Sequence, residues 1–328
     1  MPGKETKFSA LWIDKPDAKT VLNDKKQTQE MPEDLHQQLS DLIEYGYAIV
    51  PGVISNELAD ELNDEVSSVS EHSEAFIARR TRDAYIHPTQ DVVDDASYRL
   101  IDFHVNSKKA HLAIYAPKID RVLQAVFDSP ANAFQCLTFI HGSQQAMHQD
   151  GAYVVVSQPL QFMASWIALE DVTEGSGELM YRAGSNHLDD FLFPNDSKSW
   201  SPGAHGKEIH QEFLRSIVQR SEDQGMPYQT FLPKKGDALI WSADLVHGGT
   251  ANTNGRTRRS IVSHYCPIDV KPKFSTFTKY FHLRQVSDNG YISSRHYDLR
   301  PKTGLGKIWP FGKSLLKPKF MGRKIKGP

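Results

Sequence analysis

The 328-residue sequence contains only two cysteines, Cys136 and Cys266. They form no CxxC pair and are too few for a structural zinc cluster or a disulfide framework, so they are typical of a reducing compartment. No apolar run approaches the roughly 18 residues that a membrane-spanning helix needs. The N-terminal residues also lack the apolar segment of a signal peptide. Together these absences predict a cytoplasmic protein.

Acidic residues are missing from the C-terminal end, where Lys302 to Pro328 contain eight Lys or Arg and no Asp or Glu. The net charge of the whole chain is −2, so the remainder carries −10. A basic tail on an acidic body does not favour nucleic-acid binding. Basic and apolar residues alternate in the tail, which is compatible with peripheral contact to an anionic membrane surface or partner. Pro310 and Pro318 interrupt any long helix there, which favours packing on the body or exposure to solvent instead.

The remaining composition is that of a globular protein, with 39% hydrophobic and 24% charged residues, which excludes wholesale disorder. The first thirty residues are polar and aperiodic, and we expect a loose lead-in at 1–30. Residues 31–300 are expected to form a single domain, interrupted by a polar insertion at about 192–233 with its own helix near 207–219. A long excursion of this kind inside a β-rich core is typical of a lid or binding loop. The basic tail, 301–328, follows.

Helical periodicity dominates the first half of the expected domain, with apolar stripes at 35–43, 58–69 and 117–126. Gly46 supplies a stop for the first helix, and Pro117 a start for the third. After about residue 132, short β-branched and aromatic runs replace the helical pattern. They lie at 134–141, 153–156, 162–169, 178–182, 237–241 and 259–265. Helices followed by many short strands predict a mainly β fold, a sandwich or barrel with a helical buttress.

Histidine is the residue type most worth following, because the chain has fourteen. A His and a carboxylate two residues apart on a strand point to one face and can bind one metal ion. The pattern arises easily by chance and occurs five times, at His72, His148, His187, His210 and His296. Context favours His148-Gln149-Asp150, which lies between the run ending near Ile140 and the run at 153–156.

A facial metal site needs a further ligand from a distant strand, usually a histidine. His247 is the best candidate, since it opens a polar loop after the expected strand at 238–241. Arg258 follows eleven residues later, just before the next strand. An arginine returning on that strand can face the metal and bind a carboxylate through its planar guanidinium.

These residues, in this order, resemble the phytanoyl-CoA dioxygenase branch of the Fe(II)/2-oxoglutarate-dependent oxygenases. The resemblance runs from about Leu35 to Tyr265 and begins with the segment Tyr45-Gly-Tyr-Ala-Ile-Val-Pro-Gly-Val-Ile. His148-Gln-Asp, Trp166-Ile-Ala-Leu-Glu-Asp, Gly184-Ser-Asn-His, and His247 with Arg258 are similar to the later family segments. No single motif is specific, but their order and spacing together are.

The resemblance implies a double-stranded β-helix, or jelly roll, with helices on one side. It implies that His148, Asp150 and His247 hold Fe(II), and that Arg258 pairs with the far carboxylate of 2-oxoglutarate. The implied reaction consumes O2, converts 2-oxoglutarate to succinate and CO2, and oxidises a small, polar or anionic substrate. Halogenating relatives replace the ligand carboxylate with a small residue, so Asp150 favours hydroxylation or desaturation. Substrate identity and oligomeric state are not determined by the sequence.

Several residues keep two interpretations. Trp166 matches a position that lines the cosubstrate pocket in relatives, and it also suits an ordinary core. Arg256 or Arg259 takes the place of Arg258 if the strand register is shifted. His187 and Tyr153 either face the site or simply pack.

The basic cluster Arg79, Arg80 and Arg82 either binds an anionic substrate or lies in a solvated loop. Two other functional classes also stay open. One is a cupin-like enzyme that uses another metal, such as Zn2+, without oxygen chemistry, and has no need of Arg258. The other is a non-catalytic binding or membrane-associated relative.

Overall fold

The computed structural model describes residues 3–28, 30–80, 85–273 and 282–300. The helices are α1 (Ala18–Thr28), α2 (Glu33–Tyr45), α3 (Asn56–Ser67), α4 (Gln90–Asp94), α5 (Lys108–Ile114), α6 (Pro117–Phe127), α7 (Pro202–His205) and α8 (Glu208–Asp223). The strands are β1 (Tyr47–Val50), β2 (Ile77–Arg80), β3 (Tyr98–Ile101), β4 (Ala131–Phe139), β5 (Met163–Ala168), β6 (Leu179–Arg182), β7 (Tyr228–Phe231), β8 (Ala238–Ser242), β9 (His247–Gly249), β10 (Ser260–Pro267), β11 (Arg284–Gln285) and β12 (Gly290–Ile292).

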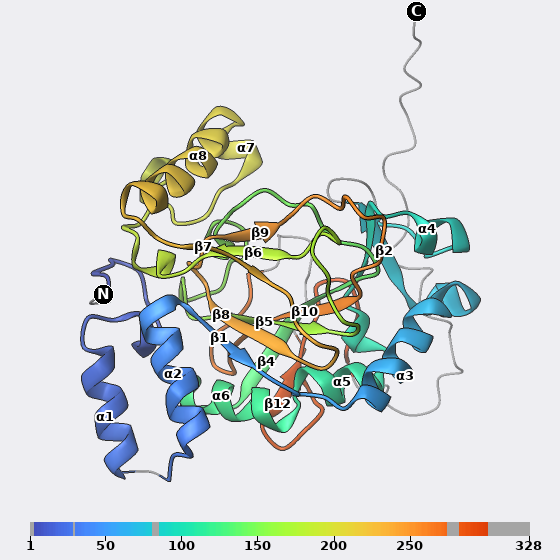
Figure 1. The fold of residues 1–328 in the computed structure, drawn as a ribbon, viewed down its shortest axis with the longest axis horizontal. Coiled ribbons are helices and arrows are strands. Elements are labelled where there is room, and N and C mark those ends of the chain that lie inside the picture. Colours follow the sequence, from blue (N-terminus) through green and yellow to red (C-terminus); the bar gives the residue numbers. More distant parts are fainter. Residues whose placement is uncertain (1–2, 29, 81–84, 274–281, 301–328) are drawn as a thin grey trace, which may run out of the picture.

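Two sheets face each other and form the expected jelly roll. In the described part of the chain, the larger sheet has nine strands, ordered β1-β8-β5-β10-β4-β12-β11, with β3 paired to β4 and β2 to β3. The smaller sheet has the order β7-β6-β9. Figure 1 shows the smaller sheet lying over one face of the larger sheet, with most helices on the opposite side. The prediction of a mainly β fold with a helical buttress is confirmed.

Strand β10 lies at the centre of the larger sheet and shows how the two faces differ. Alternate residues of a strand point to opposite faces. Val262 belongs to the apolar cluster between the two sheets, whereas Ile261 and Tyr265 belong to the core beneath the helices. Ser260 and His264 have the same parity as Val262, so they too point into the space between the sheets.

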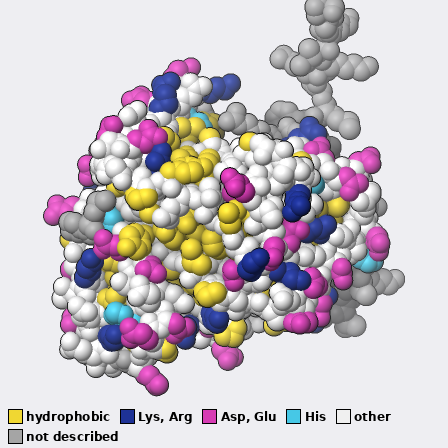
Figure 2. Space-filling model, viewed as in Figure 1, with side chains coloured by type: hydrophobic (Ala, Val, Ile, Leu, Met, Phe, Trp, Pro, Cys, Tyr) yellow, Lys and Arg dark blue, Asp and Glu magenta, His cyan; other side chains and the backbone are white. Residues whose placement is uncertain are grey.

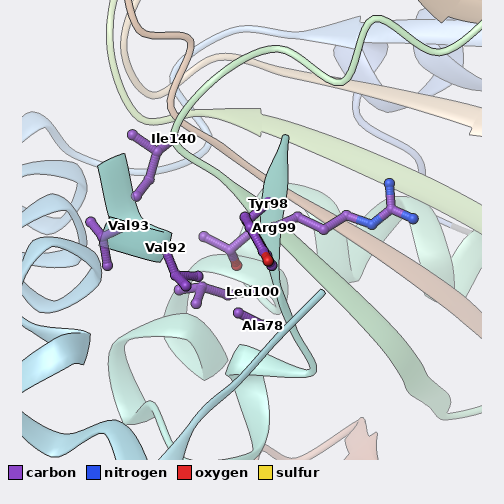
Figure 3. Close-up of a pocket in the computed structure, with 8 residues that line it drawn as sticks. Ala78, Val92, Val93, Tyr98, Arg99, Leu100 and Ile140 are labelled. Atoms are coloured by element: carbon purple, nitrogen blue, oxygen red, sulfur yellow. The ribbon is translucent and has the colours of Figure 1, made fainter. Parts of the chain in front are cut away.

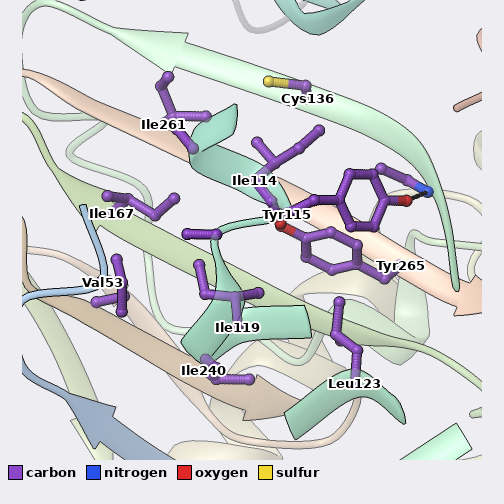
Figure 4. Close-up of a cluster of buried hydrophobic side chains, with 14 of the residues drawn as sticks. Val53, Ile114, Tyr115, Ile119, Leu123, Cys136, Ile167, Ile240, Ile261 and Tyr265 are labelled. Atoms are coloured by element: carbon purple, nitrogen blue, oxygen red, sulfur yellow. Dashed lines mark hydrogen bonds between the residues drawn. The ribbon is translucent and has the colours of Figure 1, made fainter. Parts of the chain in front are cut away.

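Helices α5 and α6 cover the outer face of the larger sheet. Ile119 and Leu123 of α6 are fully buried there, and Figure 4 shows them beside Ile167, Ile240 and Ile261 of three neighbouring strands. The helix begins at Pro117, as predicted, where the missing N–H is not needed. Burying this stripe fixes the large sheet as a rigid base for the opposite face.

Two expectations differ from the structure. The lead-in at 1–30 was expected to be loose, but Lys4 is buried and α1 packs against α2. The run 153–156 was expected to be a strand, but Val154 N donates to Asp150 O in a turn, and only Val156 forms an isolated bridge. Val154 and Val156 pack in a separate apolar cluster instead. A β-branched run fits any buried segment, so its composition did not distinguish a turn from a strand.

The segment between β6 and β7 contains α7 and α8, in agreement with the helix predicted near 207–219, but the last residues of the expected insertion, 228–231, form strand β7 of the smaller sheet. The proposed division into lead-in, domain and tail stays a prediction. The basic tail, 301–328, lies outside the described residues. Within the described ranges, no helix is both long and apolar enough to cross a membrane.

The two sheets are joined at the edge formed by β1 and β7. The Tyr47 hydroxyl donates to Gln229 Oε1 at 2.7 Å, and its ring lies 4.5 Å from that of Tyr181. Ile49 and Tyr228 on the same two strands are largely exposed, and Figure 2 shows apolar side chains gathered across this side of the molecule. Side chains therefore close the space between the sheets at this edge.

Candidate active site

Two histidines that lie far apart in the sequence meet at the end of the smaller sheet. His148 N donates to His247 O at 2.8 Å, and His247 N donates to His148 O at 2.9 Å. This reciprocal pair places the imidazole ring centres 4.4 Å apart. Gly248 makes the approach feasible, because a Cβ there would lie 2.7 Å from Gln145 O. The Gly-Gly pair after His247 thus has a steric role.

Asp150 completes the group from a short turn that begins directly after Gln149. Its Oδ1 lies 3.6 Å from His148 Nε2, and its Oδ2 lies 3.7 Å from His247 Nε2. All three residues are buried, and one ligand atom from each lies within 4.8 Å of the other two. The spacing predicted that His148 and Asp150 would share a face, and the structure brings both to His247.

Hydrogen bonds orient both imidazoles. His148 Nδ1 lies 2.9 Å from Ala146 O, and His247 Nδ1 lies 2.9 Å from Leu245 O. Since a carbonyl only accepts, each Nδ1 carries the proton and each Nε2 directs its lone pair into the space that it shares with the Asp150 carboxylate. Burial lowers the pKa of His247 to about 4, so this imidazole is neutral at physiological pH. Metal binding requires this neutral form.

Asp150 is held by two residues that the sequence analysis missed. Trp241 Nε1 donates to Asp150 Oδ2 at 3.0 Å, and His264 Nε2 lies 3.2 Å from the same oxygen. Burial alone would raise the pKa of Asp150, but the surrounding imidazoles and their hydrogen bonds to the carboxylate hold it well below its ordinary value. A signal for His264 was present, since it shares the parity of Arg258 along one strand. The carboxylate is therefore ionised and fixed in orientation.

Of the three clustered arginines, only Arg258 enters the space between the sheets. Its side chain is 2% exposed, and its guanidinium carbon lies 5.2 Å from the centre of the Trp166 ring. Arg256 is exposed. Arg259 turns outward, where Nη1 donates to Ser67 Oγ at 2.9 Å.

Arg258 is a buried cation that forms no direct ion pair with the described residues, although the more distant carboxylates of Glu178 and Glu170 favour its charged form. Its Nε has no hydrogen-bond partner, and the same holds for Trp166 Nε1 and Ser260 Oγ. Burial lowers the pKa of Arg258 to about 10, which still leaves it charged at neutral pH. A buried charge is costly unless it is paired, so these unpartnered donors fit an incoming carboxylate. Ser260 is a further residue that the sequence analysis missed, although it lies two positions from Arg258.

Two other candidates do not face the metal group. His187 Nε2 lies 3.2 Å from Glu44 O, at the end of α2. The motif Gly184-Ser-Asn-His instead has a positioning role, because Ser185 Oγ accepts a 2.7 Å hydrogen bond from Val246 N, beside His247. Tyr153 lies near the site, with its ring 5.6 Å from that of His148, but its hydroxyl is 2.7 Å from His210 Nε2 on α8.

The donor set fits Fe(II). Two imidazole nitrogens and one carboxylate on a single side match the arrangement that leaves further coordination positions open to small ligands. The three donors are buried and oriented, with a neutral imidazole at His247 and an ionised carboxylate at Asp150, which meets the conditions for metal binding.

A family model described as "Phytanoyl-CoA dioxygenase (PhyH)" matches residues 42–260. The chain belongs to the phytanoyl-CoA dioxygenase family. A protein from Caenorhabditis elegans named "Probable phytanoyl-CoA dioxygenase" is 28% identical over 131 residues. That match spans 39% of this chain and 38% of the relative, so it covers well under half of either protein.

Solved structures share the fold of this phytanoyl-CoA dioxygenase family member. The non-heme alpha ketoglutarate dependent epimerase SnoN, from nogalamycin biosynthesis, aligns with a TM-score of 0.55 and 18% identity over 86% of this chain and 95% of its own. The carbocyclase SnoK aligns with a TM-score of 0.56 and 15% identity over 74% and 87%. EctD from S. alaskensis aligns with a TM-score of 0.52 and 14% identity over 73% and 80%. At these identities, the likeness is one of fold.

Proposed function

We propose that this protein is a non-haem, Fe(II)- and 2-oxoglutarate-dependent oxygenase that hydroxylates or desaturates a small organic substrate. One observation supports the proposal above all others: a buried His-Asp-His group shares the inner space of the jelly roll with a buried, unpaired arginine. The first feature suits Fe(II), and the second suits the far carboxylate of a dicarboxylate cosubstrate. Membership of the phytanoyl-CoA dioxygenase family points the same way.

In this proposal, His148, Asp150 and His247 hold the metal, and the protein acts mainly by orientation. The bound iron with 2-oxoglutarate would supply the oxidising chemistry, with succinate and CO2 as coproducts. Backbone carbonyls keep the two Nε2 atoms directed inward, while Trp241 and His264 restrain one oxygen of Asp150. This leaves the other carboxylate oxygen, Oδ1, free of these two restraints.

Arg258 would bind and orient the cosubstrate. Its guanidinium presents several donors in one plane, which suits bidentate pairing with a carboxylate. Trp166 and Phe139 flank it, with ring centres 5.2 and 5.7 Å from the guanidinium carbon. These rings exclude water, which strengthens the ion pair. The unpartnered Trp166 Nε1 and Ser260 hydroxyl are further donors for that carboxylate.

The reaction outcome is the finer part of the proposal. Asp150 occupies the position of the ligand carboxylate, which supports hydroxylation or desaturation. The epimerase and carbocyclase among the structural neighbours act by other outcomes on a related fold. The same proposal includes a small-molecule substrate. It also includes a cytoplasmic location, which was inferred from the presence of only two cysteines.

The cupin-like alternative, with a metal such as Zn2+ and no oxygen chemistry, needs only the three metal ligands. It gives no role to Arg258, whose uncompensated burial would then be a standing cost to stability. A non-catalytic relative likewise has no use for three oriented ligands.

Product analysis separates these possibilities. We expect the Fe(II)-loaded protein to convert 2-oxoglutarate to succinate and CO2 slowly, even without substrate, in an oxygen-dependent reaction. His247→Ala should abolish the reaction, and Zn2+ should not support it. An activity that is supported by Zn2+ and independent of oxygen would contradict the proposal.

A further inference from the structure

Two arginines stand directly opposite each other at the side of the larger sheet that is distant from β1. Arg79 of β2 is the register partner of Arg99 of β3, so the two side chains leave the sheet on the same face. Like charges placed directly opposite on neighbouring strands destabilise a sheet. An anion bound between them would remove that repulsion.

The pair belongs to the inner face of the sheet. The guanidinium carbon of Arg99 lies 5.9 Å from the ring centre of Phe139, and Arg258 lies 5.7 Å from the same ring. Figure 3 shows the side chain of Arg99 extending away from the small outer-face hollow that Ala78 and Leu100 line. Arg99 and the proposed cosubstrate arginine therefore share one aromatic neighbour.

Arg99 has no acidic partner among the described residues. It is half-buried, and its Nε has no hydrogen-bond partner. Burial, together with the charge of Arg79, lowers the pKa of Arg99. Arg79 is held in place, since its Nη1 donates to the Tyr85 hydroxyl at 2.8 Å and its guanidinium carbon lies 4.8 Å from that ring. The result is an oriented pair of cations in which Arg99 has unused donors.

The arginine pair lies beside the apolar packing between the two sheets and not within it. Within the described residues, β2 and β3 contribute nothing to the apolar cluster between the sheets. At the opposite edge, by contrast, Tyr47 ties the two sheets together. Ile101 and Leu137, which are register partners with the same parity as Arg99 and Phe139, supply an apolar wall beside the arginine pair.

We propose that Arg99, with Arg79 beside it, binds the anionic end of an elongated organic substrate, a carboxylate or a phosphoryl group. This inference rests on the proposed function and extends it to the substrate class. Along β4, Gln135 is the partner of His264 near the metal group, and Phe139 is the partner of Ser260. Four residues of a strand span roughly 13 Å, so the anion would lie on the order of 10 Å from the oxidised carbon.

A second hollow, of about 600 Å3, opens between Met147 and α8. Its rim carries exposed side chains of both signs, Glu212 and Arg215. It therefore does not select for the charge of a ligand. The Arg79–Arg99 pair carries charge of one sign and therefore predicts a preference for anions.

The test compares anionic probes with an uncharged analogue. Calorimetric titration under anaerobic conditions would use the full chain with Fe(II) and saturating 2-oxoglutarate, so that Arg258 is already occupied. The probes are 6-phenylhexanoate, 6-phenylhexyl phosphate and the neutral 6-phenylhexanamide. We expect at least one anion to bind roughly tenfold or more tightly than the amide, as charged hydrogen bonds typically provide. The two anions distinguish a carboxylate site from a phosphoryl site.

Matched variants locate the effect. Arg99→Gln should reduce anion binding to the level of the amide, and Arg79→Gln should weaken it. Arg80→Gln removes the same charge from the next residue of β2, where Nη2 pairs with Asp95 at 2.8 Å on the other face, and should leave binding unchanged. Arg99→Gln should also raise the urea midpoint of the metal-free protein, because it relieves the repulsion. This second readout excludes misfolding as the cause of lost binding.

Several results would overturn the inference: equal binding of acid and amide, unchanged anion binding in Arg99→Gln, or no binding of either anion to the wild type. Failure of the proposed function is seen separately, in 2-oxoglutarate titrations of the same variants. Arg99→Gln should retain cosubstrate binding. If the wild type binds no 2-oxoglutarate, the oxygenase proposal fails, whatever the anion probes show.

Discussion

Replacing Arg258 with methionine should affect the metal-free protein and the cosubstrate complex in opposite directions. Burial lowers the pKa of this arginine from 12.5 to about 10, and at 1.36 kcal/mol per unit this corresponds to a cost of about 3 kcal/mol for keeping the buried charge. Methionine retains much of the apolar stem between Trp166 and Phe139 but loses some packing. We therefore expect Arg258→Met to raise the free energy of unfolding of the metal-free protein by about 1–3 kcal/mol, measured by urea denaturation.

The same substitution removes the proposed partner of the cosubstrate carboxylate. Hydrogen bonds to charged groups contribute about 1.5–3 kcal/mol each, so losing the bidentate pair, about 3 kcal/mol or more, should lower 2-oxoglutarate affinity by roughly 150-fold or more. Anaerobic calorimetry with the Fe(II)-loaded protein measures this affinity. Arg256→Met, at an exposed position two residues away, is the matched control and should change neither quantity. If Arg258→Met is less stable than the wild type and binds 2-oxoglutarate equally well, then Arg258 is neither a costly buried charge nor the partner of the cosubstrate carboxylate.

Three further substitutions test the surroundings of the site. Lys198 Nζ contacts Asp190 at 2.7 Å and Asp244 at 2.9 Å in a buried ion network, so Lys198→Met should lower the free energy of unfolding by about 3–5 kcal/mol; an unchanged urea midpoint would contradict this. Burial raises the pKa of Asp14 to about 6, so its carboxylate lowers stability progressively from about pH 4 to about pH 6, as the unfolded form ionises first. Asp14→Asn should therefore be more stable than the wild type by about 3 kcal/mol above pH 7, with a smaller gain at pH 5; urea melts at both values check the sign. His264→Phe should weaken Fe(II) binding roughly 10- to 100-fold, because Asp150 loses one restraint; competition with a fluorescent chelator measures this, and equal affinity would show that His264 does not position the ligand.

The residues of the candidate site that the sequence predicted share local signals. His148 and Asp150 lie two apart, and Arg258 falls at the start of a clear strand. The partners of these residues were less accessible. Trp241 reaches Asp150 from 91 residues away, and nothing in its neighbourhood distinguishes it from a core tryptophan. His264 could be found only by noting that it lies six residues after Arg258 and therefore points to the same face of the strand.

The fold shows the same division between local and long-range information. Helices α2 and α6 follow directly from their apolar periodicity and their Gly46 and Pro117 boundaries. The order of the N-terminal segment was not predicted because Lys4, which anchors it, is buried through contacts with Asp190 and Asp244, 186 and 240 residues away. A polar segment acquires order from such distant partners, and composition alone does not reveal them.

The proposed oxygenase site is tested most directly by an anaerobic titration of the metal-free protein with Fe(II) and 2-oxoglutarate, followed by visible absorption. A keto-acid chelated to Fe(II) gives a charge-transfer band, and we expect this band in the wild type. His148→Ala should abolish it, Arg258→Met should weaken it at a given 2-oxoglutarate concentration, and Arg256→Met should leave it intact. Tight metal binding without any band in the wild type would contradict the assignment of an oxygenase site and favour a metalloenzyme without oxygen chemistry.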